Sequence, residues 1–471
     1  MSLSEAVAAA VRPQKLSEKR KVSLPPIELT THAASYGSPL ECVNSDYQSP
    51  SSDASGVVVT TIFLCDGKAV QFRVIDGKRS TTSRLLSLIA SHCKVDGAAL
   101  KETCSLWMVC SILEIQLKSH HIPYCIARDW STVLKRFTNA DGWTLENTKP
   151  ILVLRRRVYL SIERELELAE SSEWLTEMLY ASAKEEVLSG RYMCDVETAI
   201  KLAALQMALE YGHYDENEHT IMRISEEVPF FFAKRHVSSV KTASLLGHPL
   251  KSFLGREKDL LDEFKRVVGS FKTKSDIRKN YLDIVRRLPY YGAAFFTGEI
   301  ERRPPESVKD FKKFVLYQTV PMMKVCVGVS DRFFTVASAS LKTELLVLPR
   351  SECHYQNIGL QPDGSSFGTP GEAPASLLLE FTSQEEENST KENNILQIFT
   401  PQAVFITALL DAFAKSGNSS LRSSEDSCSD GASSSSCSPA ICKRDKFCMA
   451  SYSPEGKFIG AQGSLRTVLQ A

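Results

Sequence analysis

The stretch VLSGRYMCDVETAIKLAALQMALEYGHYDEN, residues 187–217, limits the fold more than any other part of this sequence. It begins as a tight glycine turn and continues as a run in which apolar residues recur every three or four positions, the spacing of one helix face. The residues on that face are Val196, Ala199, Ile200, Ala203, Ala204, Met207, Ala208 and Tyr211. Gly212 suits the C-terminal cap of this helix. Other helices must bury such a face, so residues 161–290 are predicted to form a compact helical bundle.

Period-two patterns on both sides of the bundle predict β-structure. Residues 57–160 open with two β-rich runs around Asp66-Gly67, a strong hairpin signal, and continue with a helix over 80–93 and further strands. Residues 291–415 contain many short apolar strands followed by a helix capped by Thr400. The predicted class is α+β: a small ubiquitin-like roll, a helical bundle, and a sandwich of the pleckstrin-homology or phosphotyrosine-binding type with a C-terminal helix.

Both ends of the chain lack a sustained apolar period. Residues 1–56 are rich in Ser, Ala, Pro and charge, and residues 416–471 include the serine-rich run SGNSSLRSSEDSCSDGASSSSCSP. Segments of this composition bury too little apolar surface to offset the entropy of ordering. We therefore expect both ends to be disordered.

Composition excludes several classes of protein. Lys+Arg and Asp+Glu both number 56, so there is no basic excess of the kind that binds nucleic acid. The 13 cysteines show no C-x-x-C pair, which indicates reduced thiols in the cytosol. The first residues lack the apolar core of a signal peptide, and no run approaches the roughly 18 apolar residues of a membrane span. A cytoplasmic protein with only peripheral membrane contact is expected.

No pattern of catalytic or metal-binding residues emerges from the sequence. His120 and His121 are adjacent, so their side chains point apart on an extended chain. Cys437, Cys442 and Cys448 lack the paired spacing of a zinc site, and no glycine-rich phosphate loop follows a strand. The sequence predicts no enzyme, no metal and no cofactor.

Two motifs resemble the signatures of the FERM family. The first comprises the Leu-x-Gly-Arg turn at 188–191, Cys194, Glu197 and the Gly-x-Tyr at 212–214; the second is RLPYYGAAFFTGEI at 287–300. The resemblance implies a ubiquitin-like lobe at 57–160, an acyl-CoA-binding-protein-like bundle at 161–290 and a PH/PTB-like lobe at 291–415. It also implies a monomeric, non-catalytic adaptor recruited to the cytosolic face of the plasma membrane. The implied partner is the amino-terminal cytosolic tail of an iRhom pseudoprotease, whose complex with a shedding metalloprotease the adaptor would stabilise.

Two other functions within the family remain open. One is an effector of the Krev-interaction-trapped type, which would bind a Rap-type small GTPase and a receptor tail. Only 56 residues precede the first expected strand, too few for the ankyrin repeats of that type. The other is a membrane–cytoskeleton linker of the ezrin or protein 4.1 type, but no basic, helix-prone region follows residue 416.

The candidate partner-binding site lies in the third lobe. An edge strand beside the terminal helix would accept a peptide as an additional strand, and by analogy with the family this strand is expected at 351–357. The candidate groove residues are Cys353, Tyr355, Asn357, Phe405, Ala408, Leu409 and Ala412. Phe405 and Leu409 are equally consistent with core positions, and a crevice between the first and third lobes is a competing docking surface.

Basic clusters are the candidate membrane-facing sites, because anionic headgroups attract basic segments. They comprise Arg155, Arg156, Arg157, Lys272, Lys274, Lys309, Lys312 and Lys313, for which solvated helix faces and loops are the commoner explanation. Ser23 follows the basic run KRKV and is a candidate phosphorylation site.

Overall fold

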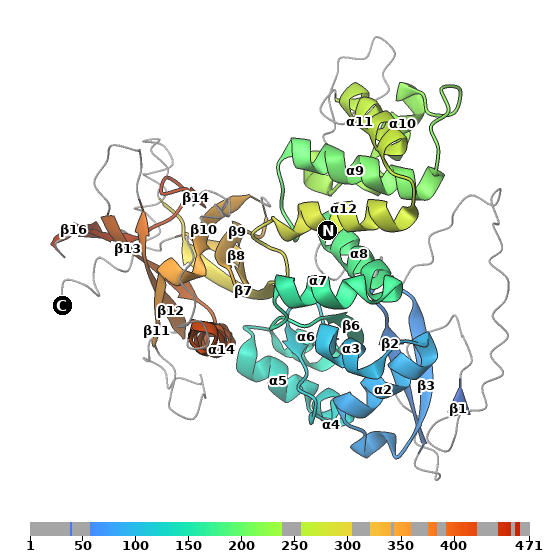
Figure 1. The fold of residues 1–471 in the computed structure, drawn as a ribbon. Coiled ribbons are helices and arrows are strands. Elements are labelled where there is room, and N and C mark those ends of the chain that lie inside the picture. The colour runs from blue at the N-terminus through green and yellow to red at the C-terminus, as the bar shows by residue number, and fades with distance from the viewer. Residues whose placement is uncertain are drawn as a thin grey trace. The chain divides into compact units, whose positions relative to one another are not determined.

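The computed structural model describes residues 38–39, 57–237, 256–303, 321–340, 343–358, 375–383, 392–421, 441–453 and 457–461. These ranges combine helices with two sheets, which confirms the predicted α+β class (Figure 1). The chain divides into two compact units. One comprises Met1–Lys135 with Asn139–Ser182, and the other comprises Arg136–Thr138 with Ala183–Ala471.

A six-stranded sheet forms the centre of the first unit. Its strands are β1 (Ser38–Pro39), β2 (Val57–Phe63), β3 (Ala69–Ile75), β4 (Cys104–Val109), β5 (Glu114–Gln116) and β6 (Ile151–Arg156). They lie in the order β1-β3-β2-β6-β4-β5, and only β2 and β6 pair in parallel. Gly67 has φ 79° in the turn between β2 and β3, which confirms the predicted hairpin. β1 lies within residues 1–56, so the predicted disorder does not extend to this pair of residues.

Short helices cover the sheet of the first unit. They are η1 (Gly77–Arg79), α2 (Thr82–Cys93), α3 (Gly97–Thr103), α4 (Pro123–Arg128), α5 (Trp130–Phe137), α6 (Gly142–Asn147) and α7 (Ile162–Glu170). α2 begins where the Thr81 side chain accepts a hydrogen bond from the Arg84 amide, and it buries Leu85 and Ile89. This packing gives the ubiquitin-like roll that the sequence predicted.

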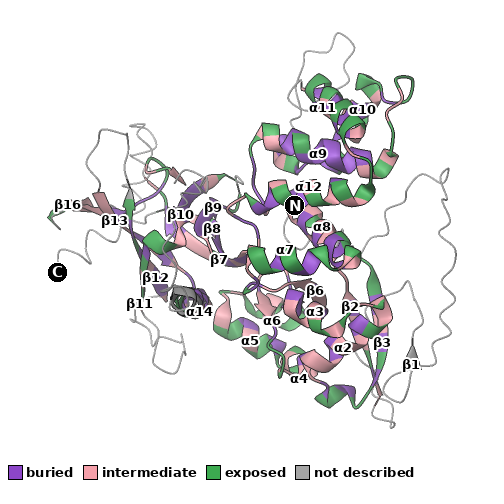
Figure 2. Cartoon of the chain, in the orientation of Figure 1, coloured by how far each residue is buried: buried purple, intermediate pink, exposed green. Residues whose placement is uncertain are grey.

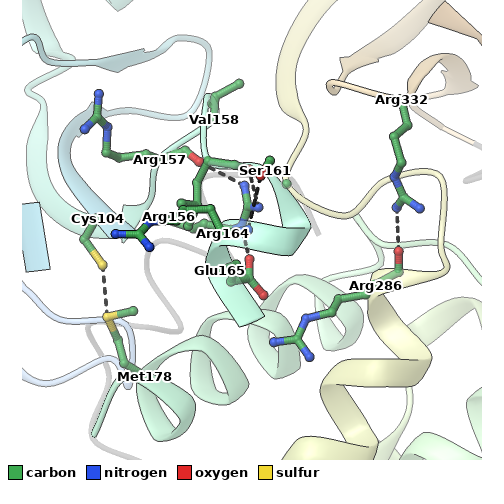
Figure 3. Close-up of polar contacts among 12 residues, drawn as sticks. Cys104, Arg156, Arg157, Val158, Ser161, Arg164, Glu165, Met178, Arg286 and Arg332 are labelled. Atoms are coloured by element: carbon green, nitrogen blue, oxygen red, sulfur yellow. Dashed lines mark hydrogen bonds and ion pairs between the residues drawn. The ribbon is translucent and has the colours of Figure 1, made fainter. Parts of the chain in front are cut away.

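A buried ion pair holds α7 to β6 (Figure 3). The Arg156 guanidinium donates to the Glu165 carboxylate and to the carbonyl oxygens of Arg157 and Leu160. The side chain of Glu165 is fully buried and that of Arg156 is 9% exposed. Both charged groups are removed from water, so the attraction between them must offset the cost of burying each charge.

The second unit contains a group of helices (Figures 1 and 2). They are α8 (Glu173–Leu188), which begins in the first unit, α9 (Val196–Tyr211), α10 (Ile221–Phe231), η2 (Lys234–His236), α11 (Glu257–Ser270) and α12 (Lys274–Arg286). α9 packs against α10, α11 and α12, and its residues 202–208 are all buried. The prediction of one buried face was too narrow. Its several alanines allow neighbouring helices to approach closely from more than one side.

The two signature motifs meet where the helices join the second sheet. The amide of Gly292 donates to the Tyr192 hydroxyl at 3.0 Å. The Arg191 guanidinium lies 4.4 Å from the ring centroid of Phe295 and also pairs with Glu186 at 3.0 Å. The two motifs therefore contact each other and connect the helical part to the sheet.

The second sheet is built from β7 (Ala294–Glu301), β8 (Met322–Val329), β9 (Phe333–Ser338), β10 (Glu344–Pro349), β11 (Cys353–Ile358), β12 (Ser376–Ser383), β13 (Glu392–Phe399), β14 (Ile441–Cys442), β15 (Ala450–Tyr452) and β16 (Phe458–Ala461). η3 (Arg350–Glu352) precedes β11, and α14 (Ala403–Leu421) packs on the sheet. The main path runs β11-β12-β13-β7-β8-β9-β10-β14, while β15 pairs with β13 and β16. Every neighbouring pair is antiparallel, as in the predicted sandwich.

The expectation that all of residues 416–471 are disordered is wrong for β14, β15 and β16. Phe447, Cys448, Met449 and Ala450 are buried, and α14 itself continues to Leu421. The boundaries of the three predicted lobes stay a prediction, because the two compact units divide the chain at other residues. For example, the ion pair between Arg156 and Glu165 joins α7 to the first sheet.

Replacing Glu165 tests the buried ion pair. Glu165→Gln leaves the Arg156 charge buried without its counter-charge, so we expect the free energy of unfolding to fall by about 3–5 kcal/mol. Urea denaturation followed by circular dichroism measures this loss. The control Arg164→Gln removes an exposed pair with Glu102 and should change stability little. Equal effects of the two substitutions would contradict this role.

Acid should destabilise the second unit through His236. Burial, reinforced by the neighbouring Arg235, lowers the pKa of this histidine from 6.5 to about 4. The unfolded chain therefore binds a proton that the folded chain excludes, and the stability contribution is lost as pH falls from about 6.5 towards 4. His236→Gln should flatten the pH dependence of the unfolding free energy over this range. Parallel pH profiles for the variant and the wild type would be inconsistent with a buried neutral histidine.

Candidate functional site

Strand β11 lies at one end of the second sheet. All six of its residues pair with β12, from Cys353 opposite Phe381 to Ile358 opposite Ser376. No strand among the described residues pairs with its other side. Backbone groups along a free edge can accept a further strand, so this geometry suits an extended peptide.

Two side-chain hydrogen bonds connect β11 to α14. The Tyr355 hydroxyl donates to the Asp411 carboxylate, and the Asn357 amide donates to the Thr407 hydroxyl at 3.0 Å. Tyr355 and Asn357 alternate along the strand, so they share the face that meets the helix. The Asn357 Oδ1 atom is buried and has no hydrogen-bond partner among the described residues. The seam between β11 and α14 is therefore polar, with one acceptor unused.

Titration should not disturb this seam near neutral pH. Burial, followed by the hydrogen bond to Asp411, raises the pKa of Tyr355 to about 12. Burial also raises the pKa of the Cys353 thiol to about 12. Tyr355 thus remains a hydrogen-bond donor and Cys353 remains a neutral thiol, which gives this region no activated nucleophile.

The helix side of the predicted groove is only partly correct. At 3.6 residues per turn, Thr407, Asp411 and Ala414 share one flank of α14, which faces β11. The predicted residues Phe405, Ala408 and Ala412 occupy a second flank, about a third of a turn away. Phe405 instead lies against Phe137, which belongs to the same unit, with ring centroids 4.3 Å apart. Leu409 is 6% exposed and belongs to the core.

The structure thus brings Cys353, Tyr355 and Asn357 together with residues that the sequence analysis missed. Thr407 and Asp411 are polar residues four positions apart within the otherwise apolar stretch 403–414 of the helix. That spacing places both on one side of a helix and was the available signal. The apolar residues predicted from the helix do not include the two that bond to β11, and their role in partner binding stays a prediction.

The three arginines at 155–157 form ion pairs and hydrogen bonds within the first unit. Arg155 pairs with Glu114 at 3.0 Å, and Arg156 pairs with buried Glu165. Arg157 donates to the Lys101 carbonyl oxygen at 3.1 Å. A membrane-facing patch built on these arginines was therefore wrong for Arg155 and Arg156, because local carboxylates already balance their charges.

The remaining basic candidates divide into two groups. Lys272 and Lys274 are exposed where α11 gives way to α12, and their membrane-facing role stays a prediction. Lys309, Lys312, Lys313 and Ser23 lie outside the described residues.

The described part of the chain holds neither a cluster of metal ligands nor a membrane-spanning helix. Three or more His, Cys, Asp or Glu residues gathered as metal ligands do not occur within it. Its helices are all too short or too polar to cross a bilayer.

Solved structures with FERM modules are similar to this chain at low identity. The human Myosin 7b C-terminal MyTH4-FERM domain in complex with harmonin-a PDZ3 is 14% identical with a TM-score of 0.46, covering 77% of this chain and 60% of that one. The FERM and C-terminal domain complex of Drosophila Merlin is 12% identical with a TM-score of 0.41, covering 77% and 98%. This chain therefore spans about 60% of the myosin chain.

Sequence relatives give a closer comparison. The FERM central domain family matches residues 165–296. FERM domain-containing protein 8 of Homo sapiens is 28% identical over 387 residues, covering 80% of this chain and 78% of the relative. The Xenopus laevis protein of that name is 30% identical over 371 residues, covering 76% of each. This chain belongs to the FERM family and is related within it to FERM domain-containing protein 8.

Proposed function

We propose that this chain is a non-catalytic adaptor that binds the cytosolic tail of a transmembrane protein as an added strand on β11. The observation that carries the proposal is the outer edge of β11, which no described strand covers, next to the seam formed with α14. Main-chain hydrogen bonds along such an edge supply affinity, and contacts to alternate side chains supply specificity.

The seam is suited to positioning a peptide. Tyr355 and Asn357 anchor β11 to α14, which fixes the strand before a partner arrives. Less ordering is then needed on binding, so more of the interaction energy appears as affinity.

The family relationship supplies the proposed partner. By resemblance to FERM domain-containing protein 8, the tail belongs to an iRhom pseudoprotease. Binding would recruit this chain to the cytosolic face of the plasma membrane and stabilise the complex of iRhom with a shedding metalloprotease. Lys272 and Lys274 would add weak contacts to anionic headgroups.

Two alanine substitutions on α14 distinguish its flanks. Ala414 and Ala408 are both exposed, but only Ala414 lies on the flank that faces β11. Ala414→Glu should weaken binding of an iRhom amino-terminal tail peptide to the full chain about tenfold or more, because it places a charge beside the added strand. Ala408→Glu should leave the dissociation constant nearly unchanged. Isothermal titration calorimetry measures both, and thermal melting verifies that each variant folds.

If Ala408→Glu weakens binding and Ala414→Glu does not, the tail uses the flank of Phe405. If both variants bind the tail as tightly as the wild type, docking at α14 is contradicted. A parallel titration with GTP-loaded Rap tests the competing function. Saturable binding to Rap without binding to the tail would refute the adaptor proposal itself.

A further inference from the structure

The carboxyl-terminal segment, residues 441–453 and 457–461, contacts the second sheet at two separate places. Its first residues form β14 on the outer side of β10, with Cys442 opposite Leu346 and Ile441 opposite Val347 (Figure 1). The Lys443 amide continues this pairing by donating to the Leu345 carbonyl oxygen at 2.9 Å. The segment thus covers the edge of β10.

The second contact fills an opening between β7 and β13. These two strands pair only at Glu299 and Phe399. Beyond that point, the segment lies between them. On the β7 side, the Cys448 amide donates to the Glu301 carbonyl oxygen at 2.9 Å, and the Arg303 amide donates to the Lys446 carbonyl oxygen at 3.2 Å.

On the β13 side, β15 pairs with residues 393–395. Backbone groups of both diverging strands thereby gain partners that neither strand gives the other, and buried backbone groups require such partners.

Side chains reinforce this backbone pairing. Phe447 is 1% exposed, and the three residues after it are also buried. Arg444 forms an ion pair with Glu392 at 2.7 Å, and the Ser451 hydroxyl donates to the fully buried Asn394 at 2.8 Å. The segment therefore makes apolar, ionic and backbone contacts, like a bound peptide ligand.

We propose that this sheet has a second strand-accepting surface, formed by the edge of β10 and the opening between β7 and β13, and that the chain's own carboxyl-terminal segment occupies it. The surface is separate from β11, so the inference does not rest on the proposed function. Occupation by the segment prevents this surface from pairing with another exposed strand. Residues 422–440 join α14 to β14, which makes the segment a ligand tethered to its own site.

Cleavage of the connection tests whether the segment behaves as a bound ligand. A site-specific protease sequence is inserted between residues 422 and 440 of the full chain, which is then cut and passed over a size-exclusion column. The carboxyl-terminal fragment should co-elute with the remainder at the mass of one chain. Loss of the wild-type fragment, or retention only in a particle of twice the mass, would overturn the assignment.

Two phenylalanine substitutions provide a matched comparison. Phe447→Asp places a charge at a buried position and should weaken binding of the cut fragment to the rest of the chain about 100-fold or more, so that the fragment no longer co-elutes. Phe458→Asp makes the same change at a residue that is 39% exposed and should leave retention intact. Similar behaviour of the two variants would overturn the proposal.

A charge exchange covers the case in which Phe447→Asp prevents folding of the uncut chain. Arg444→Glu should weaken retention by repelling Glu392, and Glu392→Arg in the same chain should restore it. Failure of the second substitution to restore retention would contradict the proposed seating of the segment.

Discussion

Backbone pairing at strand edges is the constraint on which the second sheet depends. β10 and the opening between β7 and β13 gain their partners from residues far along the chain, whereas β11 keeps a free outer side among the described residues. A free edge is normally hazardous because it can pair with any exposed strand. Here it lies beside α14, where Tyr355 and Asn357 fix its inner face. Of the strands that α14 packs against, β11 is the one at the end of the sheet's main path.

The helical part serves this arrangement as a support. Its signature residues Tyr192 and Arg191 contact Gly292 and Phe295 at the start of the second sheet. These contacts give both motifs a packing role at the start of the second sheet.

Local sequence signals predicted the helices and strands better than they predicted which of these elements pack or pair with one another. The Asp66-Gly67 hairpin and the helix over 80–93 follow from turn chemistry and periodicity. The strand expected at 351–357 came from analogy with the family, and the observed strand is Cys353–Ile358. Periodicity reports which residues share a face but not how many neighbours surround a helix, which is why α9 is buried more widely than expected. It also cannot show that Arg156 reaches Glu165. The short strands after residue 440 were not predicted because two to four residues carry too little periodicity, and the adjoining serine-rich composition suggested disorder.

Hydrogen–deuterium exchange tests the central claim, that a partner's tail pairs with the free edge of β11. The full chain is labelled with and without a saturating iRhom amino-terminal tail peptide. The account predicts slower exchange of amides in 353–358, with little change in β10, whose edge β14 already covers. Protection confined to β10, to the helical part or to the first unit would contradict strand addition at β11.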